Sequence, residues 1–124
     1  MAKKVLLVDD SATVLMMERM ILASERFQIV TAANGEEAHA RARSEQPDLI
    51  LMDIVMPKMT GIQACRVIKE DPTTSHIPII LVTTRGEADS MEAGYSSGCN
   101  DYVTKPVNSA ELLGKIRNIL GVQS

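Results

Sequence analysis

The stretch Val5-Leu-Leu-Val-Asp-Asp10 places two aspartates directly after four consecutive apolar residues. An apolar residue at every position is typical of a strand that is covered on both faces, as in a parallel sheet between two layers of helices. A run of four residues is too short for a buried helix. The stretch therefore predicts a buried parallel strand with two carboxylates at its carboxyl end.

Similar runs recur along the chain and alternate with helical patterns. Further strands are expected at Phe27–Ala32, Leu49–Met52, Ile79–Val82 and Tyr102–Thr104. Helices are expected around residues 14–21, after the cap Asn34, over Gly61–Glu70, over Glu87–Ser97, and from the cap Ser109 to Gly121. In the first helix, Val14, Met17 and Ile21 share a face that is expected to pack on the core. Met16, Met17 and Met20 are expected to pack in the core with some exposure at the surface, and a Met-rich partner surface is the alternative.

Five β–α units in series predict an α/β, doubly wound (βα)5 fold of the flavodoxin-like type. Because crossovers between parallel strands are right-handed, few topologies remain. The commonest has a five-stranded parallel sheet of order 2-1-3-4-5 with helices on both faces. The 124 residues carry no repeat or linker, so we expect one domain over residues 1–124.

The composition limits the classes of function. A net charge of −3 argues against a nucleic-acid partner. Cys65 and Cys99 stand far apart, without the spacing of a zinc site or a disulfide framework. No apolar run approaches the roughly 18 residues that a membrane span needs. We therefore expect a cytoplasmic protein with no membrane or nucleic-acid partner.

Polar residues follow four strands that the expected order makes neighbours: Asp9, Asp10, Asp53, Thr83 and Lys105. Ligands of such sheets bind outside the carboxyl ends of the strands, where the strand order reverses. Adjacent strands lie about 4.8 Å apart, so these side chains can meet in one cleft. Each residue alone could be a helix cap or a solvated turn residue, but their occurrence at four adjacent strand ends favours a functional site.

Three carboxylates in one cleft repel each other, so either their pKa values rise or a cation joins them. Hard oxygen ligands without imidazole or thiolate favour Mg²⁺, with Mn²⁺ or Ca²⁺ as alternatives. Lys105 adds a positive charge on the far side of Asp53, and the hydroxyl of Thr83 can donate to an anion. This arrangement suits an incoming phosphoryl group, with Asp53 as the nucleophile.

These motifs resemble the receiver domain of bacterial two-component response regulators. The resemblance covers nearly the whole chain and is carried by Val5–Asp10, Pro47–Asp53, Met56-Pro57 with Thr60-Gly61, Ile79–Thr84 and Gly98–Pro106. It implies the CheY-like version of the fold in a stand-alone domain. Met1 and the end of the chain shortly after the last helix favour a whole chain over an excised domain.

By this resemblance, Asp53 accepts a phosphoryl group from a sensor histidine kinase or a phosphotransfer protein, in a reaction that depends on Mg²⁺. Asp10, Asp53 and the backbone carbonyl of Val55 would ligate the ion, and Asp9 would act mainly through a water. Lys105 would pair with the phosphoryl group, and its bond to the following proline is expected to be cis.

The resemblance also implies a switch and its partners. Thr83 would move to bond a phosphoryl oxygen while Tyr102 turns inward, although a packed edge-strand tyrosine is the simpler alternative. The face formed by helix four, strand five and helix five would then bind a downstream target, as in chemotaxis and motility regulators and phosphorelay shuttles. We expect a monomer or weak homodimer that assists its own phosphorylation and dephosphorylation without being a turnover enzyme.

Two positions near the expected site are less ordinary. Val55 offers the attacking water no side chain, and Arg85 is a long cation two residues after Thr83. We hypothesise that they slow self-dephosphorylation, although a partner contact or a solvated position is the stronger reading of Arg85. Exchanging Val55 for Asn should accelerate loss of the acyl phosphate if the hypothesis holds.

Two alternatives compete with a phosphorylated switch. One is a pseudo-receiver, in which the same fold binds proteins without phosphorylation; such a domain would be expected to lack the aspartate pair, Asp53 or Lys105. The other is a phosphatase of the haloacid-dehalogenase type, which needs DxDx[TV] after the first strand, whereas this chain has Val8-Asp-Asp-Ser-Ala12. There is no Walker A sequence to support nucleotide binding.

Overall fold

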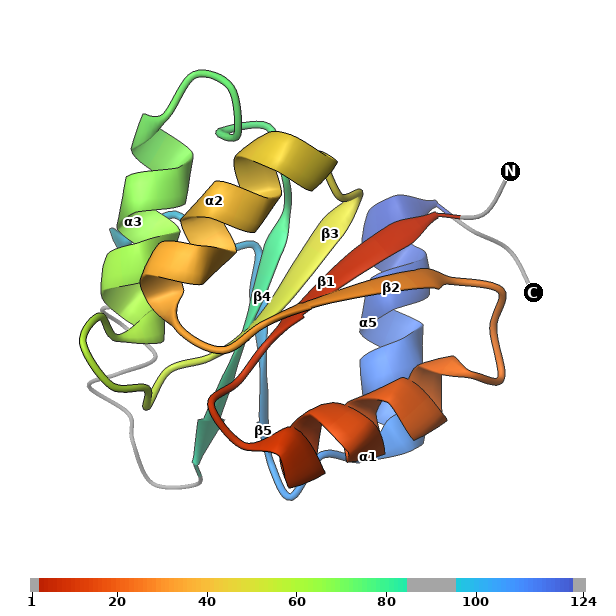
Figure 1. The fold of residues 1–124 in the computed structure, drawn as a ribbon. Helices are drawn as coiled ribbons and strands as arrows, with labels where there is room; N and C mark the ends of the chain where they lie inside the picture. The colour runs from red at the N-terminus through yellow and green to blue at the C-terminus, as the bar shows by residue number, and fades with distance from the viewer. Residues whose placement is uncertain (1–2, 85–95, 122–124) are drawn as a thin grey trace.

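The computed structural model describes residues 3–84 and 96–121 (Figure 1). The strands are β1 (Lys4–Val8), β2 (Gln28–Ala32), β3 (Leu49–Asp53), β4 (Ile79–Thr84) and β5 (Asp101–Lys105). The helices in this part of the chain are α1 (Ala12–Leu22), α2 (Gly35–Glu45), α3 (Gly61–Glu70) and α5 (Ser109–Leu120). The helix expected over Glu87–Ser97 lies almost entirely outside the described residues, as does Arg85.

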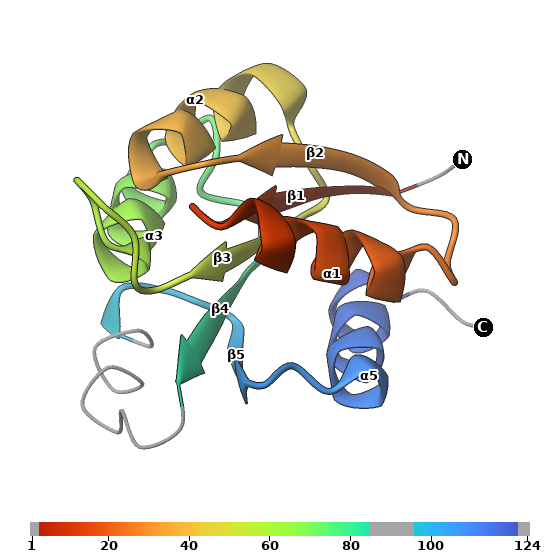
Figure 2. The same ribbon diagram turned by 60° about the horizontal axis from the view of Figure 1, so that its bottom comes forward.

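All strand pairs are parallel, and the sheet order is β2-β1-β3-β4-β5, as predicted. Figures 1 and 2 show α2 and α3 on one face of the sheet and α1 and α5 on the other. The order reverses between β1 and β3, because the chain runs first to β2 at one edge and then back past β1. The structure therefore confirms the doubly wound fold and its switch point.

Each face of the sheet carries its own hydrophobic core. Leu6, Val8, Ile50 and Met52 face the helices α2 and α3, while their neighbours in the same strands face α1 and α5. Successive side chains of a strand point to opposite faces. Because helices cover both faces of the sheet, both sets of side chains are buried. Burial on both faces explains why β1 and β3 are apolar at every position.

The helix ends follow the chemistry of their caps. The Asn34 side chain accepts from the Glu37 N–H at the start of α2, and Thr60 forms a capping box with Gln63 at the start of α3. Asn108 caps α5, so the prediction of Ser109 was wrong by one residue. The α5 helix ends at Gly121 in the left-handed region, as expected.

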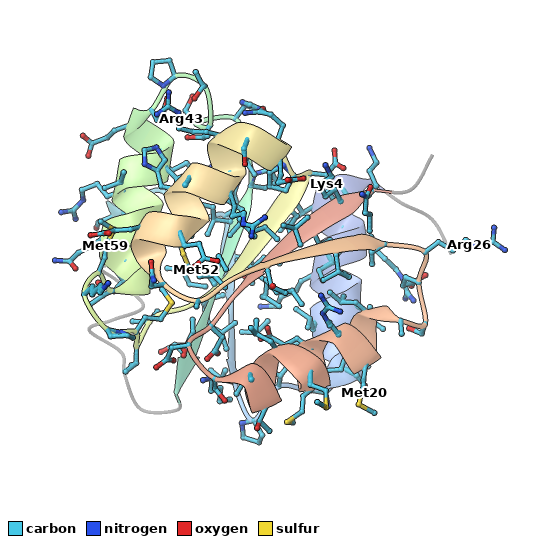
Figure 3. The ribbon with its side chains drawn as sticks, viewed as in Figure 1. Lys4, Met20, Arg26, Arg43, Met52 and Met59 are labelled. Carbon is cyan, nitrogen blue, oxygen red and sulfur yellow. The ribbon has the colours of Figure 1, made fainter. Side chains whose placement is uncertain are left out.

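The buried face of α1 differs from the prediction. Its buried residues are Glu18 and Leu22, whereas Met17 lies mostly in solvent. Met16 and Met20 are exposed as well, and Figure 3 shows the Met20 side chain projecting away from the sheet. Alternative apolar stripes of α1 are almost equally hydrophobic, so the periodicity of the sequence predicted a core face that is displaced by one residue.

No helix within the described ranges has the length and apolarity to cross a bilayer.

Candidate functional site

Three carboxylates meet at the carboxyl ends of β1 and β3. Val8 pairs in register with Met52, so Asp9 and Asp53 follow at equivalent positions of neighbouring strands. One oxygen each from Asp9, Asp10 and Asp53 lies within 4.8 Å of the others. Asp9 and Asp53 are only 2% and 6% exposed, whereas Asp10 faces solvent. The cluster is therefore a cleft with a buried floor and an open mouth.

Asp9 forms the buried floor of this cluster. Its Oδ1 accepts a hydrogen bond from the Ser11 N–H at 2.8 Å, which also fixes the turn into α1. Its Oδ2 is fully buried and accepts no hydrogen bond from any described residue. Burial, with a smaller contribution from the nearby charge of Asp53, raises the pKa of Asp9 to about 6. A cation would remove both penalties, since it supplies the missing partner and cancels the repulsion.

The donor set fits a hard divalent cation. All three candidate side-chain ligands are carboxylate oxygens, and the described residues bring no imidazole or thiolate into the cluster. Such ligands suit Mg²⁺, Mn²⁺ or Ca²⁺ rather than zinc or copper. Solvent access at Asp10 leaves room for the waters that Mg²⁺ retains. The Val55 carbonyl belongs to the loop directly after β3, and its role as a further ligand stays a prediction.

Lys105, at the end of β5, brings a positive charge to the same cleft. Its Nζ donates a hydrogen bond to Asp53 Oδ2 at 3.2 Å and lies 3.8 Å from Asp9 Oδ2. Burial lowers the pKa of Lys105, but the charges of Asp53, Asp9 and Glu18 outweigh burial, so the pKa lies above its ordinary value. Lys105 therefore remains an ammonium ion. The Lys105–Pro106 bond is cis, as predicted.

The two expected switch residues lie on the neighbouring strands β4 and β5. Thr83 is buried in β4 and pairs in register with Thr104 of β5. Tyr102 of β5 is half-buried, and Lys115 Nζ lies 5.0 Å from the centre of its ring while donating to its backbone carbonyl at 2.6 Å. The tyrosine thus packs against α5 in this conformation, and its movement stays a prediction.

The end of β3 is fixed by backbone contacts on both sides. The Ile54 N–H donates to the Val82 carbonyl, and the Gly61 N–H donates to the Ile54 carbonyl at 2.8 Å. The start of α3 lies so close that a Cβ on Gly61 would collide with the Asp53 carbonyl oxygen. Only glycine allows this approach, and the result is a rigid position for Asp53.

Glu18 of α1 is a member of this region that the sequence argument missed. It is 3% exposed, and its Oε1 is buried without a hydrogen-bond partner among the described residues. Burial raises its pKa to about 8, with smaller contributions from Asp9 and Asp53. The signal was present, since Glu18 lies four residues from both Val14 and Leu22 on a largely apolar face.

The comparisons with known proteins agree with this geometry. Residues 5–117 match the family model of the response regulator receiver domain. Protein PilH of Pseudomonas aeruginosa is 42% identical over 117 residues, covering 94% of this chain and 97% of PilH. Response regulator PleD of Caulobacter vibrioides is 40% identical over 121 residues, covering 96% of this chain but only 26% of PleD.

A solved structure extends the likeness to the site. The receiver domain of the sensor histidine kinase PA1611 from Pseudomonas aeruginosa, with magnesium in its active-site cleft, superimposes with a TM-score of 0.90. It shares 29% sequence identity, and the match covers 98% of this chain and all of that one. Fold, acidic cluster and sequence relationship together show that the chain belongs to the response regulator receiver domain family of two-component signalling.

Proposed function

We propose that this domain is a phosphoacceptor switch in which Asp53 receives a phosphoryl group from a histidine kinase or a phosphotransfer protein. The observation that carries the proposal is the position of Asp53. Its carboxylate is almost buried. It lies beside the carboxylates of Asp9 and Asp10 on one side and accepts a hydrogen bond from Lys105 on the other. With a divalent cation held by the three carboxylates and the Lys105 ammonium on the other side, Asp53 could receive a phosphoryl dianion without prohibitive repulsion.

The transfer requires one bond to form and one to break. An Asp53 carboxylate oxygen attacks phosphorus, the P–N bond of the phosphohistidine breaks, and its electron pair returns to the imidazole nitrogen. The product is an acyl phosphate on Asp53. Lys105 Nζ lies 3.2 Å from the attacking carboxylate, so its ammonium can follow the charge onto the phosphoryl oxygens. Positioning and charge neutralisation supply most of the catalysis in phosphoryl transfer.

A divalent cation, with Mg²⁺ first and Mn²⁺ second, completes the proposed site. Asp10, Asp53 and the Val55 carbonyl would hold it directly, and Asp9 would contact it through a water. When bound, it neutralises charge on the phosphoryl oxygens. Support comes from the three carboxylates of this cleft and from the magnesium ion in the PA1611 receiver domain.

The output follows from the same site. Thr83 would bond the phosphoryl group, and Tyr102 would leave its place beside Lys115 and turn inward. The resulting change in β5, α5 and the helix expected over Glu87–Ser97 would alter the binding of a downstream protein, as in single-domain regulators of chemotaxis or motility. The domain would work in the cytoplasm as a monomer or weak homodimer, and as a switch rather than a turnover enzyme.

The proposal is tested by incubation with acetyl phosphate and Mg²⁺, followed by intact mass spectrometry. We expect addition of one phosphoryl group to the parent, no addition without divalent cation, and no addition to Asp53→Asn. Asp71→Asn is a matched control, because Asp71 is another carboxylate with a cationic partner, Arg43, outside the cleft. A parent that stays unmodified would favour the pseudo-receiver alternative.

A further inference from the structure

A small cavity lies beside the cleft, between α1 and the residues that follow β5. Its volume is about 130 Å³, and its walls include Met17 and Glu18 of α1 together with Lys105 and Pro106. The other lining residues are apolar. The cavity therefore has only two chemically distinctive side chains, and one of them, Lys105, also contacts Asp53.

The buried carboxyl of Glu18 lacks a hydrogen-bond donor in this conformation. Its Oε1 has no partner among the described residues, and an unmade hydrogen bond of a buried polar group costs free energy. Lys105 has the opposite surplus, because an ammonium ion has three donors. Among the described residues its Nζ donates a hydrogen bond to Asp53 Oδ2 alone, with Asp9 Oδ2 farther away at 3.8 Å. The two side chains that carry the unused acceptor and donors, Glu18 and Lys105, line the same cavity.

The Glu18 carboxyl and the Lys105 ammonium each favour the charged form of the other. Glu18 raises the pKa of Lys105, and Lys105 lowers the pKa of Glu18 against the larger effect of burial. The four-carbon stem of a lysine lets its ammonium swing between neighbouring acceptors without a change in the backbone. The Lys105 side chain is 30% exposed, so it has space for that movement.

We propose that Glu18 is a positioning residue for Lys105, offering the ammonium a second acceptor beside the cleft when Asp53 is engaged by a cation or a phosphoryl donor. The inference rests on the proposed function, in which Lys105 binds the incoming phosphoryl group. A cation on the oxygens of Asp53 weakens the Lys105–Asp53 ion pair by competition. The Glu18 oxygen then keeps the ammonium near the cleft, with its remaining N–H groups directed to the donor.

The kinetic test compares three variants in the phosphorylation of the domain by acetyl phosphate at saturating Mg²⁺. Glu18→Leu removes the acceptor, Glu18→Gln retains an acceptor oxygen, and Met17→Leu changes another wall of the cavity. We expect Glu18→Leu to raise the half-saturating acetyl phosphate concentration roughly 3- to 10-fold, the factor that corresponds to one hydrogen bond. The maximal rate should change less than twofold, and the other two variants should resemble the parent.

A spectroscopic test reads the contact without phosphorylation. In ¹H–¹⁵N spectra recorded with Mg²⁺, the Lys105 ammonium signal, assigned by its loss in Lys105→Arg, should be protected from exchange in the parent and in Glu18→Gln. It should be broadened by exchange in Glu18→Leu, with Glu18→Met as the substitute should that variant not fold.

The outcomes separate this inference from the proposed function. A parent that acetyl phosphate does not modify overturns the proposed function, while the ammonium spectra still report on the contact. A parent that is modified, with Glu18→Leu matching it in half-saturation and in ammonium protection, overturns the positioning role alone. Equal defects in Glu18→Gln and Glu18→Leu would also contradict it, because the acceptor oxygen would then be irrelevant.

Discussion

Asp53 is the carboxylate of the cluster to which Lys105 donates a hydrogen bond. Lys105 Nζ lies 3.2 Å from Asp53 Oδ2 but 3.8 Å from Asp9 Oδ2. The two buried aspartates therefore differ in how closely the Lys105 ammonium contacts them. Asp9 Oδ2 is buried without a hydrogen bond from any described residue, while Asp53 Oδ2 accepts one from Lys105.

Removing the Lys105 ammonium tests this contact. We expect Lys105→Met to slow phosphorylation of Asp53 by acetyl phosphate roughly 100-fold, the usual cost of losing one preorganised group that stabilises developing charge. The rate is measured by intact mass over time. Lys4→Met is the matched control, because Lys4 has its ion pair with Glu45 and begins β1 at the opposite end of the strand from the cluster. Equal rates for both variants would contradict the role of Lys105.

The pH dependence of stability should report the buried carboxyl of Glu18. Its pKa is raised from 4.5 to about 8, so the folded chain holds a proton that the unfolded chain releases above pH 4.5. The free energy of unfolding therefore decreases as the pH rises through this window and levels off above pH 8. Between pH 6 and pH 8 the decrease should be roughly 2 kcal/mol.

Urea unfolding without divalent cation measures this slope. Glu18→Gln should flatten the curve between pH 6 and pH 8 and leave a slope at lower pH, where Asp9, with a pKa of about 6, titrates. An unchanged slope above pH 6 in Glu18→Gln would show that another group carries the dependence.

At the scale of elements, the strand ends were predictable and the helix faces were less so. A run of four apolar residues followed by Asp9 or Asp53 indicates a buried parallel strand with the aspartate at its carboxyl end. The structure also has the predicted strand order. The face of α1 was misplaced because Met17 and Leu22 are both apolar and only tertiary packing decides between them. Glu18 was missed because a buried acid contradicts the pattern that identifies a core face.

The packing of α3 against β3 predicts a strict requirement at Gly61. We expect Gly61→Ala to lower the free energy of unfolding by roughly 1–3 kcal/mol, because its Cβ would meet the Asp53 carbonyl and lie 2.8 Å from the Ile54 Cα. Urea unfolding measures the loss.

Gly114→Ala is the matched control for this substitution. Gly114 lies within α5, and a Cβ there would meet nothing within 4 Å. Alanine should therefore stabilise the helix by roughly 0.5–1 kcal/mol. If Gly61→Ala proved as stable as the parent, the close approach of α3 to Asp53 would be wrong.

On the scale of the whole molecule, the sheet order itself creates the site. Residues separated by up to about a hundred positions in the chain meet because β1, β3, β4 and β5 are neighbours. The burial that stabilises the sheet also buries Asp9 and Asp53, so the acidic cluster, which the single charge of Lys105 neutralises only in part, opposes folding. A bound cation should therefore stabilise the entire domain.

Thermal unfolding with and without Mg²⁺ tests this coupling. At a concentration a hundredfold above the dissociation constant, Mg²⁺ should stabilise the fold by roughly 2.7 kcal/mol, which corresponds to an increase in Tm of roughly 10 °C. Asp10→Asn should reduce the increase, since it removes one ligand of the cluster, whereas Asp71→Asn should not. A Tm that Mg²⁺ leaves unchanged in the parent would show that the cluster holds no cation.

The most direct test of the central claim identifies the residue that carries the phosphoryl group. After reaction with acetyl phosphate and Mg²⁺, borohydride reduces an acyl phosphate of aspartate to homoserine, and peptide mass spectrometry locates the change. The account predicts homoserine at position 53 and unmodified aspartates at positions 9 and 10. Reduction at Asp9 or Asp10, or at none of the three in a chain that binds Mg²⁺, would contradict it.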